Sequence, residues 1–131
     1  MRDVAAMIAG MAPRLDPEVY VFCTAPGDKA AAEAVGMFRE AEGVSLILPE
    51  RVARRLGFEV RLPMRRITLE VHSALDGVGL TAAVAVASAE AGIACNMVAA
   101  YHHDHAFVPA ARAEEAITRL RSLSRGGCPS D

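Results

Sequence analysis

The chain has 131 residues, which is the size of one compact domain or of two small modules sharing a core, so a multi-domain enzyme is excluded. It carries 14 Lys and Arg against 16 Asp and Glu, and a net charge of -2 argues against nucleic acid as a partner. Hydrophobic residues make up 53% of the sequence, which is more apolar surface than one small subunit buries, so we expect a homo-oligomer.

The cysteine pattern and the hydropathy pattern both point to a cytoplasmic protein without a membrane segment. The three cysteines are odd in number and contain no CxxC pair, which indicates neither a disulfide framework nor a zinc knuckle. The apolar stretch from Val78 to Ala100 is interrupted by Glu90, Gly92 and Asn96, so it predicts a helix, a turn and a strand rather than a membrane span.

In the first half, Val4 to Ala12 has the apolar spacing of an amphipathic helix. Pro13 and Pro17 then predict a turn, and Val19 to Thr24 is rich enough in β-branched and aromatic residues for a buried strand. The Ala-rich segment Lys29 to Val35 fits a short helix or a loop, and the sequence leaves both open.

A second apolar strand is predicted over Val44 to Leu48. Pro49 suits the first turn of a helix that ends at Leu56 and Gly57, because proline is favoured at helix starts and glycine just beyond helix ends. Extended structure is expected to resume over Phe58 to Leu62.

The second half begins with a strand over Ile67 to His72, in which apolar and polar residues alternate. A glycine-rich turn precedes a helix over Leu80 to Ala91, and Gly92 is placed to cap the end of that helix. A strand over Ile93 to Ala100 and a polar tip over Tyr101 to Asp104 follow.

The chain then continues with a strand over His105 to Val108, and Pro109 separates this strand from the last helix. The buried stripe of that helix is expected to consist of Ala113, Ala116, Ile117, Leu120 and Leu123.

Pro49 and Pro109 each follow an apolar strand and precede a helix, which indicates a divergent tandem of two modules over residues 1–62 and 63–131. We therefore expect an α/β (α+β) sandwich in which a largely antiparallel sheet carries its helices on one face.

Two motifs in the second half carry a family resemblance. Asp76-Gly77-Val78-Gly79-Leu80 and Ala89-Glu90-Ala91-Gly92-Ile93 lie within a ferredoxin-like βαββα run, and together they resemble the ACT domain. Over about residues 17 to 124, the chain also resembles a bacterial tandem-ACT family, whose members are similar to the ACT halves of amino-acid sensors. An ACT module has a fourth strand, which here must come from the first half or from another subunit.

The resemblance implies a non-enzymatic regulatory protein that binds a small molecule, with an amino acid as the favoured class and no cofactor. Helix-start amides would receive a carboxylate, and Asp76 or Asn96 would accept from an ammonium group. The candidate ligand-binding residues are Asp76, Gly77, Val78, Gly79, Leu80 and Asn96. Two structural alternatives remain open, in which Asp76 only caps the helix and Asn96 only bonds a neighbouring segment.

The run His102-His103-Asp104-His105 suggests a metal site as an alternative. In an extended segment His103 and His105 share one face while His102 and Asp104 point to the other, so at most two residues reach one ion and His72 would have to contribute. A polar tip is the preferred interpretation. No Ser in a nucleophile elbow, no phosphate loop and no paired carboxylates with a flanking base occur, which disfavours an enzyme. The alternatives are a ligand-free interaction module and, less favoured, a metal-dependent enzyme.

Overall fold

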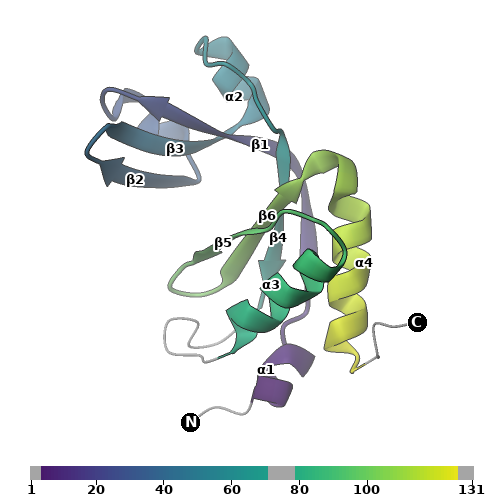
Figure 1. Cartoon of the computed structure of the whole chain (residues 1–131). Helices are drawn as coiled ribbons and strands as arrows, with labels where there is room; N and C mark the ends of the chain where they lie inside the picture. The colour runs from purple at the N-terminus through teal and green to yellow at the C-terminus, as the bar shows by residue number, and fades with distance from the viewer. Residues whose placement is uncertain (1–3, 71–78, 127–131) are drawn as a thin grey trace.

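The computed structural model describes residues 4–70 and 79–126, and it contains one six-stranded sheet in the order β2-β3-β1-β4-β6-β5 (Figure 1). Every ladder is antiparallel. The strands are β1 Arg14–Ala25, β2 Gly36–Glu40, β3 Gly43–Pro49, β4 Met64–Leu69, β5 Asn96–Ala99 and β6 Asp104–Pro109. The helices are α1 Val4–Ala9, α2 Glu50–Arg55, α3 Leu80–Glu90 and α4 Ala113–Ser124, with short 3₁₀ helices η1 Lys29–Glu33 and η3 Ala110–Arg112.

The long strand β1 belongs to both halves of the sheet. Its second part, from Tyr20 to Ala25, pairs with β3, and its first part pairs with β4. The run β4-α3-β5-β6-α4 therefore forms a complete βαββαβ module when β1 is counted as its fourth strand. Of the two sources that the sequence left open for this strand, the first half or another subunit, the structure shows the first half.

Pro17 lies inside β1, so the prediction of a turn between Pro13 and Pro17 is wrong. The register of β1 against β4 shifts between Leu15 and Val19, and this irregularity leaves Pro17 without a ladder hydrogen bond to donate. The Glu18 amide in the same segment donates instead to Asp16 Oδ1 at 2.8 Å. Sequence rules penalise proline in strands because of its missing N–H, but a bulge removes that penalty.

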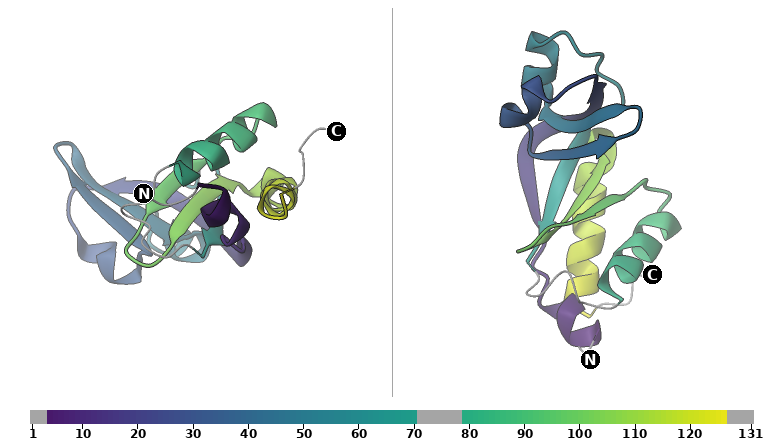
Figure 2. Two further views of the ribbon diagram at one scale, coloured as in Figure 1. Left: turned by 90° about the horizontal axis from the view of Figure 1, so that it is seen from below. Right: turned by 90° about the vertical axis from the view of Figure 1, so that its left-hand side faces the viewer.

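The helices cover one face of the sheet, as expected. Under α1, α3 and α4 lies a core cluster that includes Ile67, Leu69 and Val84, and the buried stripe of α4 joins it. A second cluster under α2 includes Val21, Leu46 and Leu48. Val19 pairs with Arg65, so the two side chains share a face. Val19 alternates with Val21 of the second cluster and Arg65 with Ile67 of the first, so both clusters lie on the same side of the sheet. Figure 2 shows α2 at one end of the molecule and α1 at the other.

The opposite face of the sheet carries no helix among the described residues. A third cluster of Tyr20, Ile47 and Phe107 is buried there. The rings of Tyr20 and Phe22 both pack edge-on against Phe107, at centroid distances of 5.8 and 5.5 Å. Toward the β2 edge of this face, Phe22 remains 42% exposed and Phe38 72% exposed, and Ser45 pairs with Phe38.

Several element boundaries differ from the expectations. The segment from Lys29 to Val35, for which the sequence left a helix or a loop open, contains η1. The edge strand β2 was not predicted, because four of its five residues are exposed and its sequence has no alternation of apolar and polar residues. Residues 58–62 lie in no strand, and β5 is shorter than expected. The polar tip ends earlier than predicted, since Asp104 is the first residue of β6. The end of the expected strand at Val71 and His72 lies outside the described residues.

Candidate functional site

The helix α3 begins at a glycine, and no described side chain caps it. Its N-cap residue Gly79 has a φ of 95°, a left-handed conformation that favours glycine, and it has no side chain that could accept a hydrogen bond from the first-turn amides. Leu80 is buried in the core and holds the helix start against the sheet. Gly79 therefore leaves the first-turn N–H groups of α3 uncapped by its own side chain, and N–H groups at a helix start attract an anion. Asp76, Gly77 and Val78 lie outside the described residues.

The direction of α3 places this helix start at one end of the sheet. The Arg112 guanidinium donates to the carbonyls of Ala91 and Gly92 at 3.0 and 3.4 Å, which fixes the C-terminal end of α3 beside the Pro109 end of β6. The 11 residues of α3 span about 16 Å, about the length of β6. The start of α3 consequently lies toward the opposite end of β6, where Asp104 is located.

Asp104 is a buried carboxylate without a hydrogen-bond partner. The residue is 3% exposed, and its Oδ1 has no partner. It pairs with Leu69, the last residue of β4, and it alternates with the buried Ala106 and Val108, so its side chain points to the helix face. Burial raises the pKa of Asp104 above its ordinary value of 3.8. Buried polar groups are rarely left unpaired, so this carboxylate is suited to a cationic group that arrives with a ligand.

Asn96 is not brought to the start of α3. It is exposed at the first position of β5 and donates to the Phe107 carbonyl at 3.3 Å. Its amide also approaches Met64 Sδ at 3.6 Å, a residue that packs on the helix-free face. Asn96 pairs with Phe107, three residues or about 10 Å along β6 from Asp104, and on the other side of the sheet. The hydrogen bond to β6 satisfies its side chain locally.

Within the histidine cluster, Asp104 and His105 lie in β6 and point to opposite faces, whereas His102 and His103 precede the strand, with their rings 6.3 Å apart. The His103 and His105 rings lie 6.4 Å apart, and the His105 Nδ1 is 3.1 Å from the Thr68 hydroxyl. The pKa of His105 is lowered by burial first and then by the positive charges of Arg66, His103 and Arg14. Within residues 4–70 and 79–126, no group of three or more His, Cys, Asp or Glu is placed to hold a metal ion.

Asp104 is the site residue that the sequence analysis missed. The polar run around it suggested a loop, whereas the structure makes it the first residue of β6, paired with Leu69 of β4. The one available signal was the alternation of Asp104 with Ala106 and Val108, which predicts a shared face once the strand is extended by one residue.

Comparisons with known proteins identify both halves. A model described as ACT domain matches residues 1–65, and a second model with the same description matches residues 62–122. A crystal structure of a Vibrio cholerae protein of unknown function, described as a possible transport protein, is 40% identical; the match covers 92% of this chain and 95% of that one, with a TM-score of 0.83. Among curated proteins, none matches the sequence.

More distant structures share the fold. The ligand-free regulatory subunit of aspartate kinase from Thermus thermophilus is 10% identical, with a TM-score of 0.63 and coverage of 87% of this chain and 97% of that one. A protein from Agrobacterium tumefaciens is 19% identical, with a TM-score of 0.65 and coverage of 86% and 87%. No helix in the described part of the chain is long and apolar enough to cross a membrane.

Proposed function

Because this chain belongs to the ACT domain family, we propose that it is a regulatory protein that binds a small zwitterion of the amino-acid class between the start of α3 and Asp104. The ligand carboxylate binds the free amides of Gly79 and Leu80, and the ligand ammonium binds the Asp104 carboxylate. No bond is made or broken, and the output is a change in how the protein associates.

The unpaired carboxylate of Asp104 carries this proposal. Ionising a buried carboxyl without a partner is unfavourable, and an ammonium group within hydrogen-bonding distance removes that cost. The start of α3, which no described side chain caps, supplies the complementary positive end on the same face of the sheet. A ligand with both charges therefore fits better than a simple anion or a simple amine.

The test is a thermal-shift screen of the twenty amino acids at millimolar concentration, followed by calorimetry on each one that stabilises the protein. A ligand at 100 times its dissociation constant adds about 2.7 kcal/mol of stability. For an amino acid that binds, the N-acetyl and methyl ester derivatives each remove one charge, and both are expected to bind more weakly.

The decisive variant is Asp104→Asn, which keeps the side-chain shape but loses the charge. It is expected to weaken the binding of the amino acid by about 1.5–3 kcal/mol, the contribution of a charge-assisted hydrogen bond. The matched control is Glu42→Gln, which removes an exposed carboxylate in the β2–β3 turn and is expected to leave binding unchanged. If none of the twenty amino acids stabilises the protein, the ligand-free interaction module becomes the better explanation.

A further inference from the structure

The N-terminal half contains a cavity that the proposed amino-acid site does not use. Its helical layer is thin, because η1 has 5 residues and α2 has 6, whereas α3 and α4 have 11 and 12. Between η1, the end of β1 and the end of α2 lies a cavity of about 460 Å³. This size is within the range of about 300–1,000 Å³ found for small-molecule sites.

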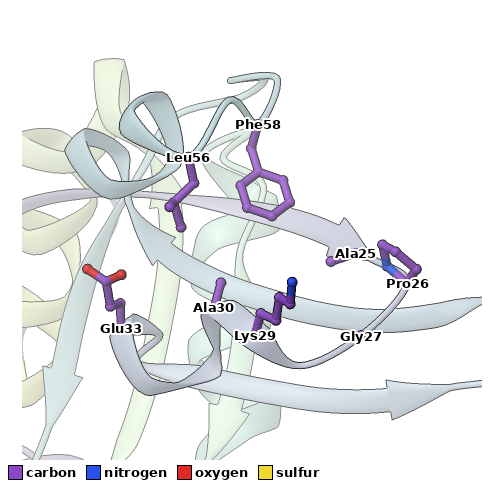
Figure 3. Close-up of a pocket in the computed structure, with 8 residues that line it drawn as sticks. All are labelled: Ala25, Pro26, Gly27, Lys29, Ala30, Glu33, Leu56 and Phe58. Carbon is purple, nitrogen blue, oxygen red and sulfur yellow. The ribbon is translucent and has the colours of Figure 1, made fainter.

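The walls of this cavity are mainly apolar. Figure 3 shows Leu56 and Phe58 pointing toward η1 from the α2 side, opposite Ala30. Leu56 is 44% exposed, and Phe58 and Ala30 are the partly buried rim of the core cluster under α2. The cavity thus gives a ligand access to apolar surface that a longer helix in place of η1 would have covered.

One positive charge at the cavity has no counter-ion. Glu33 also lines the cavity, but it forms an ion pair with Arg55, and the nearby Asp28 forms one with Arg39. Lys29, the sole lysine of the sequence, has no ion pair or hydrogen bond to another described residue. Its amine is directed toward the Phe58 side of the cavity (Figure 3). The carboxylates of Glu33 and Asp28 are already paired, so they are not available to an α-ammonium group. A ligand carboxylate, in contrast, can pair with the Lys29 amine.

From this arrangement we infer that the N-terminal half binds an apolar carboxylic acid, with its hydrocarbon part against Leu56 and Phe58 and its carboxylate on the Lys29 amine. This ligand class differs from the zwitterion proposed for the start of α3, so the two sites are independent and can be tested separately.

The single lysine allows a direct measurement. Reductive methylation with ¹³C-formaldehyde labels Lys29 and the α-amine, which give two separate NMR signals, and the α-amine signal serves as the internal reference. Titration with octanoate is expected to shift the Lys29 signal saturably and to raise the pKa of its amine. Acetate, which lacks the apolar chain, and octylamine, which has the wrong charge, are expected to leave the signal unchanged at the same concentration.

Variants separate the two parts of the site. Lys29→Met keeps the apolar stem and removes the charge, so calorimetry is expected to give an octanoate affinity lower by about tenfold or more, while octan-1-ol binds as before. Phe58→Ala is expected to weaken both octanoate and octan-1-ol. The control is Arg51→Met, which removes an exposed charge on α2 that pairs with Glu18 and does not line the cavity.

Three outcomes would overturn the proposal: no saturable shift of the Lys29 signal at millimolar octanoate, an octanoate affinity unaffected by Lys29→Met, or equal binding of octylamine. Loss of amino-acid binding in Asp104→Asn with octanoate binding intact would leave this site standing. A wild-type protein that binds an amino acid but not octanoate would refute this site without touching the proposed function.

Discussion

Pro49 and Pro109 lie on a single cross-strand row of the sheet. Pro49 pairs with Tyr20, Tyr20 pairs with Met64, and Met64 pairs with Pro109. Both prolines have the same backbone conformation, with φ and ψ of -55° and 140° in one and -53° and 134° in the other. In the strand order β2-β3-β1-β4-β6-β5, the first half β2-β3-β1 corresponds to the second half read from the opposite edge, β5-β6-β4. An approximate two-fold axis therefore passes between Tyr20 and Met64.

Asp104→Asn is expected to stabilise the ligand-free protein at neutral pH by about 1 kcal/mol, because a buried charge without a partner is removed. Burial raises the pKa of Asp104, so the folded state binds this proton more tightly than the unfolded state. Its contribution to stability is therefore present below the ordinary pKa of 3.8 and is lost as the pH rises through the raised value.

Urea denaturation of both proteins across acidic to neutral pH measures this effect. The gap between the variant and the wild type is expected to open as the pH rises. A variant destabilised by the same amount at every pH would show that Asp104 has a structural partner instead.

Asp16→Asn is expected to destabilise the protein at neutral pH by about 1–3 kcal/mol, since its carboxylate anchors the bulge of β1. It accepts from the Glu18 amide, from the Tyr20 hydroxyl at 2.7 Å and from Arg66 at 2.9 Å. Burial alone would raise the pKa of Asp16, but these hydrogen bonds and the Arg66 charge outweigh it and lower the pKa. The stabilisation is present above 3.8 and is lost as the pH falls through the lowered value.

The measurement is again urea denaturation, with Tyr20→Phe as a second variant. Tyr20→Phe removes two hydrogen bonds, the one that the hydroxyl donates to Asp16 and the one that it accepts from Arg66, and it is expected to cost about 1–3 kcal/mol. Asp28→Asn is the control, because the exposed Asp28 pairs only with Arg39 and surface ion pairs contribute about 0–1 kcal/mol. An Asp16→Asn effect no larger than the control would mean that the bulge does not depend on this side chain.

Val86→Glu is expected to disrupt self-association. The helix α3 is apolar on its outer as well as its inner face, and Val86 is 55% exposed beside an open groove that Ala82, Ala83 and Leu123 line. A helix that is apolar all round is normally covered, so we expect another copy of the chain over this face. Sedimentation at micromolar concentration should give an oligomer for the wild type and a monomer for Val86→Glu.

The control for this experiment is Leu62→Glu, which replaces an isolated side chain that is 73% exposed. It should leave the association unchanged. A wild-type protein that sediments as a monomer would refute the predicted homo-oligomer.

Chelator treatment is expected to leave the melting temperature and the secondary structure unchanged. His105 contacts Thr68 on the helix-free face, while Asp104 is buried on the other, and the described residues contain no group of three or more His, Cys, Asp or Glu that could hold an ion. Differential scanning calorimetry before and after dialysis against EDTA checks this. Stoichiometric zinc that survives purification would revive the metal-dependent alternative.

The sequence predicted the elements whose pattern is set by burial on one face. Ile67 and Leu69 in β4 and the stripe of Ala113, Ala116, Ile117 and Leu120 in α4 are buried as expected. The edge strand β2 escaped detection because its residues are mostly exposed and because Gly36 stands where the Ile47 side chain passes, 3.0 Å from the position of a Cβ. Edge strands have little burial to encode, so their pattern is weak.

The candidate site was predictable only in part. The positive φ of Gly79 and the buried Leu80 agree with a glycine-rich turn that opens a helix. The role of Asp104 depends on its cross-strand neighbour Leu69, and such a pairing is not visible in one sequence. The cavity beside Lys29 depends on the length of η1, which the Ala-rich segment left open.

The sharing of β1 between the two halves affects how the chain folds. Arg14 pairs with Thr68, so the central ladder joins residues that are far apart in sequence, and closing such a loop slows folding. During synthesis on the ribosome, β1 can pair with β3 early, but its other edge has no partner until β4 has emerged. Until then, the backbone N–H and C=O groups along that edge of β1 in the nascent N-terminal half are unpaired. A chaperone or a second nascent copy would bind first at this edge.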